Sequence, residues 1–169
     1  QSLPQWSGGS GGLLVDWNLK TSLEGLYAAG SQTFSANDHS YAASTGRYAG
    51  RKAAAYAKEI GESKVSRDQI EAEKARVFAP VKRDSGIEWK ELHAGIARIM
   101  QYYVSEFKTE NLYNIALQAI QKIEEESVPR LFALDPHKLM RTLEDLSMLE
   151  NAKIIIHASL ARKASSMAL

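Results

Sequence analysis

The stretch that decides the fold of the first half of the chain is GLYAAGSQTFSANDHSYAASTGRYAG, residues 25–50. Its apolar run at 26–30 is short and ends at a glycine, which is typical of a strand that stops in a turn. Small residues then recur at helical spacing and predict a helix over 39–58. Because the first turn of a helix presents backbone N–H groups and the positive end of its dipole, the loop before residue 39 favours contact with an electron-rich or anionic ligand, and a purely structural turn is the alternative.

Glycine and charge divide the chain into two unlike parts. Residues 1–50 hold eight of the eleven glycines but few charged side chains, and the rest of the chain reverses that balance. Glycine favours tight turns and opposes long helices, so the first part is expected to contain turns and short strands, including a strand at 12–16. We therefore expect two domains, over 1–62 and 63–169, and an α+β fold that is mainly α.

The second part is predicted to be an antiparallel helical bundle. Ser66 is a candidate N-cap for a helix over 67–79, and Pro80 ends that helix. Three longer amphipathic helices follow, and they are expected to begin near Ser85, Glu110 and Pro136. Their apolar residues repeat every three or four positions and their connections are short, which favours about three long helices packed around a common core.

Composition excludes several classes of function. A net charge of +1 gives no electrostatic reason to expect a nucleic-acid partner or direct contact with a membrane surface. The lack of cysteine excludes a disulfide scaffold, a cysteine nucleophile and a thiolate metal site. The longest strongly apolar runs, such as 154–156, are too short to insert into a membrane as a spanning helix. Since the chain begins with Gln1 and no signal-peptide pattern follows, residue 1 is not expected to be the natural start.

Histidine, the usual general acid or base, gives no catalytic assignment. Three of the four histidines fall within predicted helices, and no pair has the spacing of a metal site. His39 differs because it lies in the glycine-rich part, just before a predicted helix. The sequence therefore assigns no catalytic residue and no metal ligand.

Several motifs resemble the flavoprotein subunits of succinate dehydrogenase and fumarate reductase. TSLEGLYAAG at 21–30 is similar to their T-x-x-x-GLYAAGE segment, and GGLLVD at 11–16 to the GGI-x-V-D strand before it. TGRYAG at 45–50 resembles the FGR-x-AG helix, DPHKLMR at 135–141 the start of a long C-terminal helix, and SLARKAS at 159–165 the ALARKESRGAH element. The matches follow the family's order along nearly the whole chain. The resemblance implies the C-terminal part of an FAD-dependent flavoprotein.

The resemblance also implies a set of cofactor-binding residues. In the family, the turn after the GLYAAG strand and the loop behind it contact the ribityl chain and the isoalloxazine ring of FAD. Two residues of this chain then lie at the turn, two at the flavin ring and two at the start of the next helix, whose N–H groups and dipole would stabilise negative charge on the N1/O2 edge of the reduced ring. These residues are Gly30, Ser31, Asn37, Asp38, His39 and Ser40.

The chain departs from the family's pattern at the substrate side of the site. Ser31 replaces the acidic residue that follows AAG, and the HGANRLGG stretch, which holds a dicarboxylate substrate, is shortened away between Ser31 and Asn37. Residues 1–46 contain no arginine, and SMAL at 166–169 replaces the family's RGAH. These departures argue against simple succinate or fumarate chemistry. The short glycine-rich loop at 6–12 looks closer to the adenylylsulfate reductase alpha branch or to other, uncharacterised relatives.

Two functional hypotheses remain. The first is a piece of an oxidoreductase that contributes one edge of the FAD site and is inactive alone, because the G-x-G-x-x-G unit and the capping domain of the superfamily are absent from these residues and a cofactor site needs most of its shell. Its partners would be the remainder of the flavoprotein chain and, as a second candidate, an iron–sulfur subunit for electron transfer. Its location would be cytoplasmic, with membrane association only through partner subunits. The alternative is a non-enzymatic helical module that docks on another protein through residues 66–163.

Overall fold

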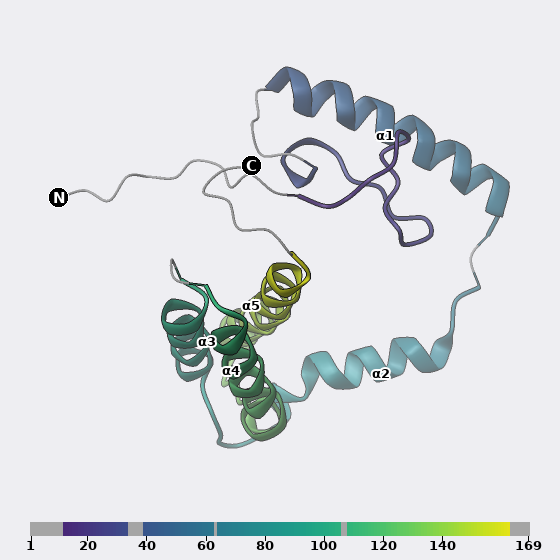
Figure 1. Cartoon of the computed structure of the whole chain (residues 1–169). Coiled ribbons are helices and arrows are strands. Elements are labelled where there is room, and N and C mark those ends of the chain that lie inside the picture. Colours follow the sequence, from purple (N-terminus) through teal and green to yellow (C-terminus); the bar gives the residue numbers. More distant parts are fainter. Residues whose placement is uncertain (1–11, 34–38, 63, 106–107, 163–169) are drawn as a thin grey trace. The chain divides into compact units, whose positions relative to one another are not determined.

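The computed structural model describes residues 12–33, 39–62, 64–105 and 108–162 (Figure 1). These residues contain five α-helices: α1 His39–Ile60, α2 Arg67–Phe78, α3 Trp89–Tyr103, α4 Glu110–Lys122 and α5 Pro136–Ala161. Shorter helical turns lie before α1 and between the later helices: η1 Gly30–Gln32 before α1, then η2 Pro80–Lys82, η3 Ile123–Ser127 and η4 Val128–Arg130. The chain divides into two compact units between Val65 and Ser66, whereas the sequence placed the boundary between residues 62 and 63.

The strands expected at 12–16 and 26–30 do not form. In the described part of the chain no strand is present, and the first unit has a single antiparallel bridge between Lys20 and Tyr27. A strand is stable only where a neighbouring strand takes up its N–H and C=O groups along its length, and these residues provide only isolated pairs. The described fold is therefore mainly α, and the β part of the expected α+β class is not observed.

The first unit consists of α1 and the loop that packs along it. The helix predicted over 39–58 is confirmed and ends two residues later, at Ile60. Gly61 follows with φ +69°, the left-handed conformation that commonly ends a helix. Within α1 only Ala49 is buried, so most of the surface of this helix has no cover from the described residues of the unit.

The second unit begins with α2, which is mostly polar and has no continuous apolar face. As predicted, the Ser66 side chain caps it by accepting from the Gln69 N–H at 3.3 Å, and the helix ends at Phe78, two residues before Pro80. No residue of α2 is buried. A helix without an apolar face gains little from packing, so α2 contributes little to the core of this unit.

Helices α3, α4 and α5 form the bundle that the sequence predicted. Its N-caps are Thr109, which accepts from the Leu112 N–H at 3.2 Å, and Asp135, which accepts from the Lys138 N–H at 2.8 Å. The three helices share one core, made of Leu92, Ile96, Ile99, Tyr113, Ala116, Ile120, Leu131, Leu149, Ala152 and Ile156. The helix predicted from about Ser85 starts later, at Trp89, because the residues before it pair with the chain after α4.

That pairing is a parallel bridge between Ile87 and Leu131. The Ile87 N–H donates to the Arg130 carbonyl at 2.8 Å, and the Phe132 N–H donates to the Ile87 carbonyl at 2.9 Å. The guanidinium of Arg83 donates to the Leu131 carbonyl at 2.7 Å. The segment before α3 is therefore extended, since its backbone groups are used by a distant segment and not by a helical turn.

Candidate functional site

The turn at Gly30 is held against α1 by a hydrogen bond and by close packing. The Gly30 N–H donates to Thr45 Oγ1 at 3.0 Å, and the Thr45 hydroxyl donates to the Tyr41 carbonyl at 2.6 Å. Gly30 is buried, has φ +61°, and would bring an added Cβ to 3.5 Å from the Cβ of Ala42. Because a side chain disfavours the left-handed backbone region, glycine is the residue that adopts this turn without strain.

The residue after η1 ties the end of the turn to the start of α1. The Thr33 hydroxyl donates to the Gly30 carbonyl at 2.8 Å, and it lies 2.9 Å from the phenol oxygen of Tyr41. A threonine hydroxyl has one proton, so the Tyr41 hydroxyl is the donor in that second pair. These bonds fix the turn relative to the first turns of the helix.

The structure places four of the six candidate cofactor residues in this one unit. Gly30 and Ser31 lie in η1, and His39 and Ser40 are the first two residues of α1. Gly30 is buried, whereas the other three are exposed. The turn and the helix start, which the sequence predicted to act together, therefore belong to one packed element pair.

The first turn of α1 has the electrostatic character expected of a site for an electron-rich group. The helix residues of this turn include no acidic side chain, so the only carboxylate next to the positive end of the dipole in the sequence is that of Asp38, directly before the helix. Asn37 and Asp38 lie outside the described residues, and their contact with a flavin ring stays a prediction.

A charged and aromatic cluster fixes the second half of α1. Lys20 Nζ lies 2.8 Å from Glu24 Oε1 and 5.4 Å from the centre of the Tyr56 ring. The hydrogen bond from Lys20 lowers the pKa of Glu24, and the hydrogen bond to Glu24 raises the pKa of Tyr56. The ring of Tyr27 packs edge-on against Tyr56 at 6.4 Å. Since the charges are solvated, this cluster orients α1 more than it stabilises it.

The first unit also carries large apolar side chains in solvent. Leu14 is 93% exposed and Trp17 is 97% exposed. Trp17 sits in a tight turn whose Asp16 carboxylate accepts from the N–H of Lys20 at 3.0 Å. Exposed apolar surface on an ordered segment is typical of a face that packs against further protein.

A hydrogen-bonded pair between a buried aspartate and a half-exposed histidine in the bundle was missed by the sequence interpretation. Asp145 on α5 is 2% exposed, and its Oδ1 lies 2.9 Å from Nδ1 of His93 on α3. The second carboxylate oxygen of Asp145 has no hydrogen-bond partner among the described residues. Helical spacing could have predicted that Asp145 is buried, because it stands four residues before Leu149 and therefore lies on the same face of the predicted helix.

The described ranges give no sign of two other kinds of site. Within them, no group of three or more His, Cys, Asp or Glu side chains is placed to hold a metal ion. Nor does any helix of the described residues combine the length and apolar character that crossing a membrane requires.

Comparison with solved structures finds the same fold in chains of quinol-fumarate reductases. A chain of an E. coli quinol fumarate reductase with a mutation in FrdA aligns with a TM-score of 0.70 and 23% identity, and it covers 91% of this chain. A chain of a quinol-fumarate reductase with menaquinol molecules aligns with a TM-score of 0.73 and 22% identity over the same share.

This chain spans 29% of the length of each of these two matched chains. The resemblance seen in the motifs is thus confirmed at the level of the fold. No protein-family model and no curated protein matches the sequence.

Proposed function

We propose that this chain is part of an FAD-dependent oxidoreductase of the fumarate reductase and succinate dehydrogenase flavoprotein superfamily. The observation that carries the proposal is the likeness in fold, with TM-scores of 0.70 and 0.73 over 91% of the chain. The motifs of the sequence, which occur in the family's order, support it. Because this chain spans 29% of the matched chains, catalysis is assigned to a longer protein and not to these residues alone.

The role of the first unit is to form the flavin-ring and ribityl edge of the FAD site. The first turn of α1 supports this role, since its backbone N–H groups lie at the positive end of the helix dipole, and the left-handed turn at Gly30 is hydrogen-bonded to the same helix. FAD would supply hydride and electron-pair chemistry. The residues named here, Ser31, His39 and Ser40 among them, would bind and orient it, with Asn37 and Asp38 at the ring.

The helical second unit is proposed as a docking module. Its partners are the remainder of the flavoprotein chain and, as a second candidate, an iron–sulfur subunit that would exchange electrons with the flavin. The proposed location is cytoplasmic, with association to a membrane through such subunits. The missing substrate arginine among residues 1–46 favours a substrate other than succinate or fumarate.

A non-enzymatic interaction module is the second candidate, and the arrangement of residues 25–50 weighs against it. In a purely helical module this stretch would add another helix to the core of the bundle. Instead it forms a turn and a helix that pack on each other in the first unit, while the core cluster lies in the second. This division argues against a single helical bundle that includes residues 25–50.

The reading frame that encodes the chain tests the proposed function. A G-x-G-x-x-G segment, preceded by a strand and followed by a helix, is expected upstream of Gln1 in the same frame. A complete upstream frame without such a segment would contradict the flavoprotein assignment.

Titration of the 169-residue chain with FAD, followed by flavin fluorescence, tests the incompleteness of the site. Little or no binding is expected, because these residues form one edge of the site. Micromolar affinity would show that the chain holds the cofactor without further protein, which the proposal denies.

A variant of the longer protein tests the Gly30 turn itself. Gly30→Val is expected to lower the ratio of FAD to protein, because the side chain opposes φ +61° and crowds Ala42. Gly46→Ala is the matched control on α1, since its added methyl group would meet no atom within 4 Å. An unchanged ratio of FAD to protein in a folded Gly30→Val variant would show that the turn is not part of the FAD site.

A further inference from the structure

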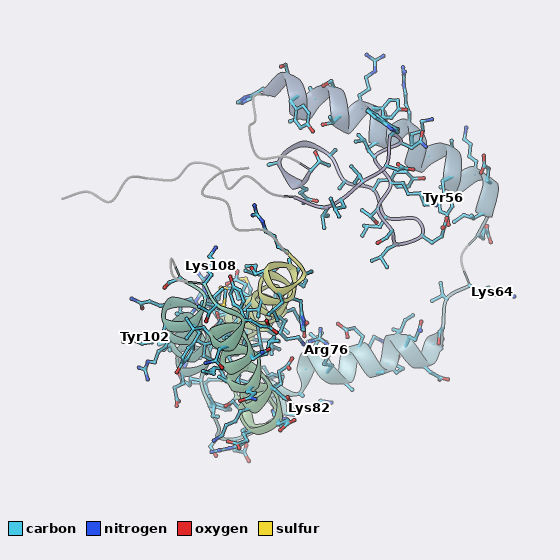
Figure 2. The ribbon with its side chains drawn as sticks, viewed as in Figure 1. Tyr56, Lys64, Arg76, Lys82, Tyr102 and Lys108 are labelled. Atoms are coloured by element: carbon cyan, nitrogen blue, oxygen red, sulfur yellow. The ribbon has the colours of Figure 1, made fainter. Side chains whose placement is uncertain are left out.

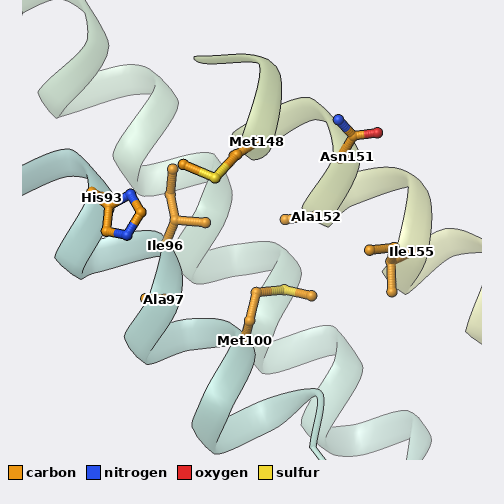
Figure 3. Close-up of a pocket in the computed structure, with 8 residues that line it drawn as sticks. All are labelled: His93, Ile96, Ala97, Met100, Met148, Asn151, Ala152 and Ile155. Carbon is orange, nitrogen blue, oxygen red and sulfur yellow. The ribbon is translucent and has the colours of Figure 1, made fainter. Parts of the chain in front are cut away.

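The two units differ in what they offer a ligand. The second unit has an open face between α3 and α5, lined mostly by apolar side chains such as Ile96, Met100 and Ile155 (Figure 3). A face of that kind has few polar groups that would select one ligand and fix its orientation. The first unit instead holds a hydrogen-bonded network at the Gly30 turn, and that network gives Thr45 a role of its own.

The hydroxyl of Thr45 donates one hydrogen bond and accepts another inside the first unit. Its proton goes to the Tyr41 carbonyl at 2.6 Å, the usual bond of a helical threonine to the residue four positions earlier. Its oxygen accepts from the N–H of Gly30 at 3.0 Å, although the two residues are 15 positions apart in sequence. Since the first bond fixes the direction of the hydroxyl, Thr45 presents a lone pair to the Gly30 turn.

The carbonyl side of Gly30 is held as well. It accepts from the Thr33 hydroxyl at 2.8 Å and from the Thr33 N–H at 3.0 Å. Thr33 Oγ1 in turn lies 2.9 Å from the phenol oxygen of Tyr41. The N–H and the C=O of Gly30 are therefore both tied to one turn of α1, through Thr45 on one side and Tyr41 on the other. These bonds together form the Gly30 clamp.

The clamp depends on the type of residue at position 45. TGRYAG at 45–50 resembles the FGR-x-AG segment of the flavoprotein family, and Thr45 stands where that segment has phenylalanine. A phenyl ring has no oxygen or nitrogen that could accept from the N–H of Gly30. Gly30 is buried, and a buried donor without a partner is costly. The bond between the turn and α1 is therefore a feature of this chain's own sequence.

We propose that Thr45 is a positioning residue of the FAD site, because its hydroxyl locks the Gly30 turn to α1. This inference rests on the proposed function, in which the turn forms the ribityl side of the site and the start of α1 forms the ring side. A site binds its ligand more tightly when the elements that contact the ligand are already held in place relative to each other. Thr45 provides this order by acting through the backbone of Gly30.

Variants of the longer flavoprotein test this role through two measurements other than activity: the dissociation constant of FAD and the reduction potential of the bound flavin. Thr45→Val keeps the shape of the side chain and removes the hydroxyl. FAD is expected to bind roughly five- to tenfold more weakly, the effect of one net hydrogen bond. The potential is expected to become more negative, because the start of α1 would be less well placed to stabilise the reduced ring.

Three further variants make the test specific. Thr45→Ser keeps the hydroxyl and should restore both values. Ser44→Ala is the matched control and should change neither value, because the Ser44 hydroxyl donates to the same Tyr41 carbonyl at 3.1 Å, whereas the acceptor for the Gly30 N–H is Thr45. If Thr45→Val fails to fold, Thr45→Ala replaces it, since alanine favours a helix and also lacks the hydroxyl.

Three outcomes would overturn the proposal. The first is an unchanged affinity and potential in a folded variant without the hydroxyl. The second is a loss that Thr45→Ser does not restore, which would assign the effect to packing of the methyl group. The third is an equal loss in Ser44→Ala, which would show that any change in this turn of α1 disturbs the flavin. Absence of FAD from the unmodified longer protein is a distinct result, because it contradicts the proposed function itself, and this inference falls with it.

Discussion

At the scale of single residues, two glycines show what sequence can and cannot reveal. Gly30 ends an apolar run, so its turn was predictable, and its φ of +61° explains the need for glycine. Gly86 gave no such signal. An added Cβ there would overlap the carbonyl oxygen of Arg130, a residue far away in sequence. Local patterns indicate a turn, but they carry no information on which distant backbone comes close.

The Gly86→Ala variant is expected to destabilise the second unit by roughly 1–3 kcal/mol, the usual cost of overpacking. The methyl group would press on the segment that pairs Ile87 with Leu131. Gly95→Ala is the matched control on α3, since its Cβ would reach only the flexible end of Ile123 at 3.4 Å and alanine favours a helix. Urea unfolding measures both; equal midpoints for the two variants would contradict the close approach at Gly86.

The His93–Asp145 pair is expected to behave as a coupled unit. His93→Leu removes the only hydrogen-bond partner of Asp145 among the described residues. We expect a loss of about 2 kcal/mol, below the range for a fully buried pair because His93 is half exposed. His93→Leu with Asp145→Leu should recover much of that loss, since no buried carboxylate is left unpaired. Additive losses in a double-mutant cycle would show that the two residues are independent.

At the scale of elements, the N-caps of the helices were predictable from the sequence, but the buried face of each helix was only partly predictable. Ser66 and Asp135 cap α2 and α5 as expected, because a cap depends on neighbours three residues away. The spacing of Leu112, Ala116, Ala119 and Ile123 predicts one apolar face for α4, whereas its buried residues are Tyr113, Ala116 and Ile120. Helix α4 has apolar residues along more than one stripe, so its own sequence does not decide which stripe is buried. Packing against α3 and α5 decides it, and these are tertiary contacts.

Lys153 on α5 anchors the π-helical turn η3 that follows α4. Its Nζ lies 2.7 Å from Glu124 Oε1 and 3.2 Å from a carboxylate oxygen of Glu150. The hydrogen bond to Glu124 is the main cause that raises the pKa of Lys153. A raised pKa in the folded state means that this stabilisation is fully present below the ordinary lysine pKa and is lost as the pH rises through the folded value.

Lys153→Met is therefore expected to lower the free energy of unfolding by about 0.5–1 kcal/mol near neutral pH. The difference from the unmodified chain should vanish at strongly alkaline pH, above the raised pKa. Lys122→Met is the control, because Lys122 Nζ lies 3.9 Å from Glu126 Oε1 and both side chains are well exposed. Figure 2 draws the side chains of the described residues; the Lys82 and Arg76 labelled there lie on η2 and α2. A pH-independent effect of Lys153→Met would assign its role to packing of the alkyl stem.

At the scale of the whole molecule, the core lies in one unit and the candidate cofactor residues in the other. All ten members of the core cluster belong to α3–α5 and the segment around Leu131. The first unit buries few side chains, Ala28 and Ala49 among them. The motifs indicated the turn and the helix of that unit, but they also predicted strands at 12–16 and 26–30. Strands depend on partners that the described residues lack, so local apolar runs could not decide between a strand and an extended loop.

This imbalance predicts unequal stability within one chain. Amide hydrogen exchange of the full chain should protect the inner faces of α3, α4 and α5 most strongly, because they open only with the core. The amides of α1 should exchange faster, since Ala49 is the only buried residue of that helix. Residues 66–165 expressed alone should keep a cooperative unfolding transition, whereas residues 1–65 alone should not. Equal protection of α1 and α5 would mean that the first unit is as stable as the bundle, and it would contradict the expectation that α1 lacks sufficient packing of its own.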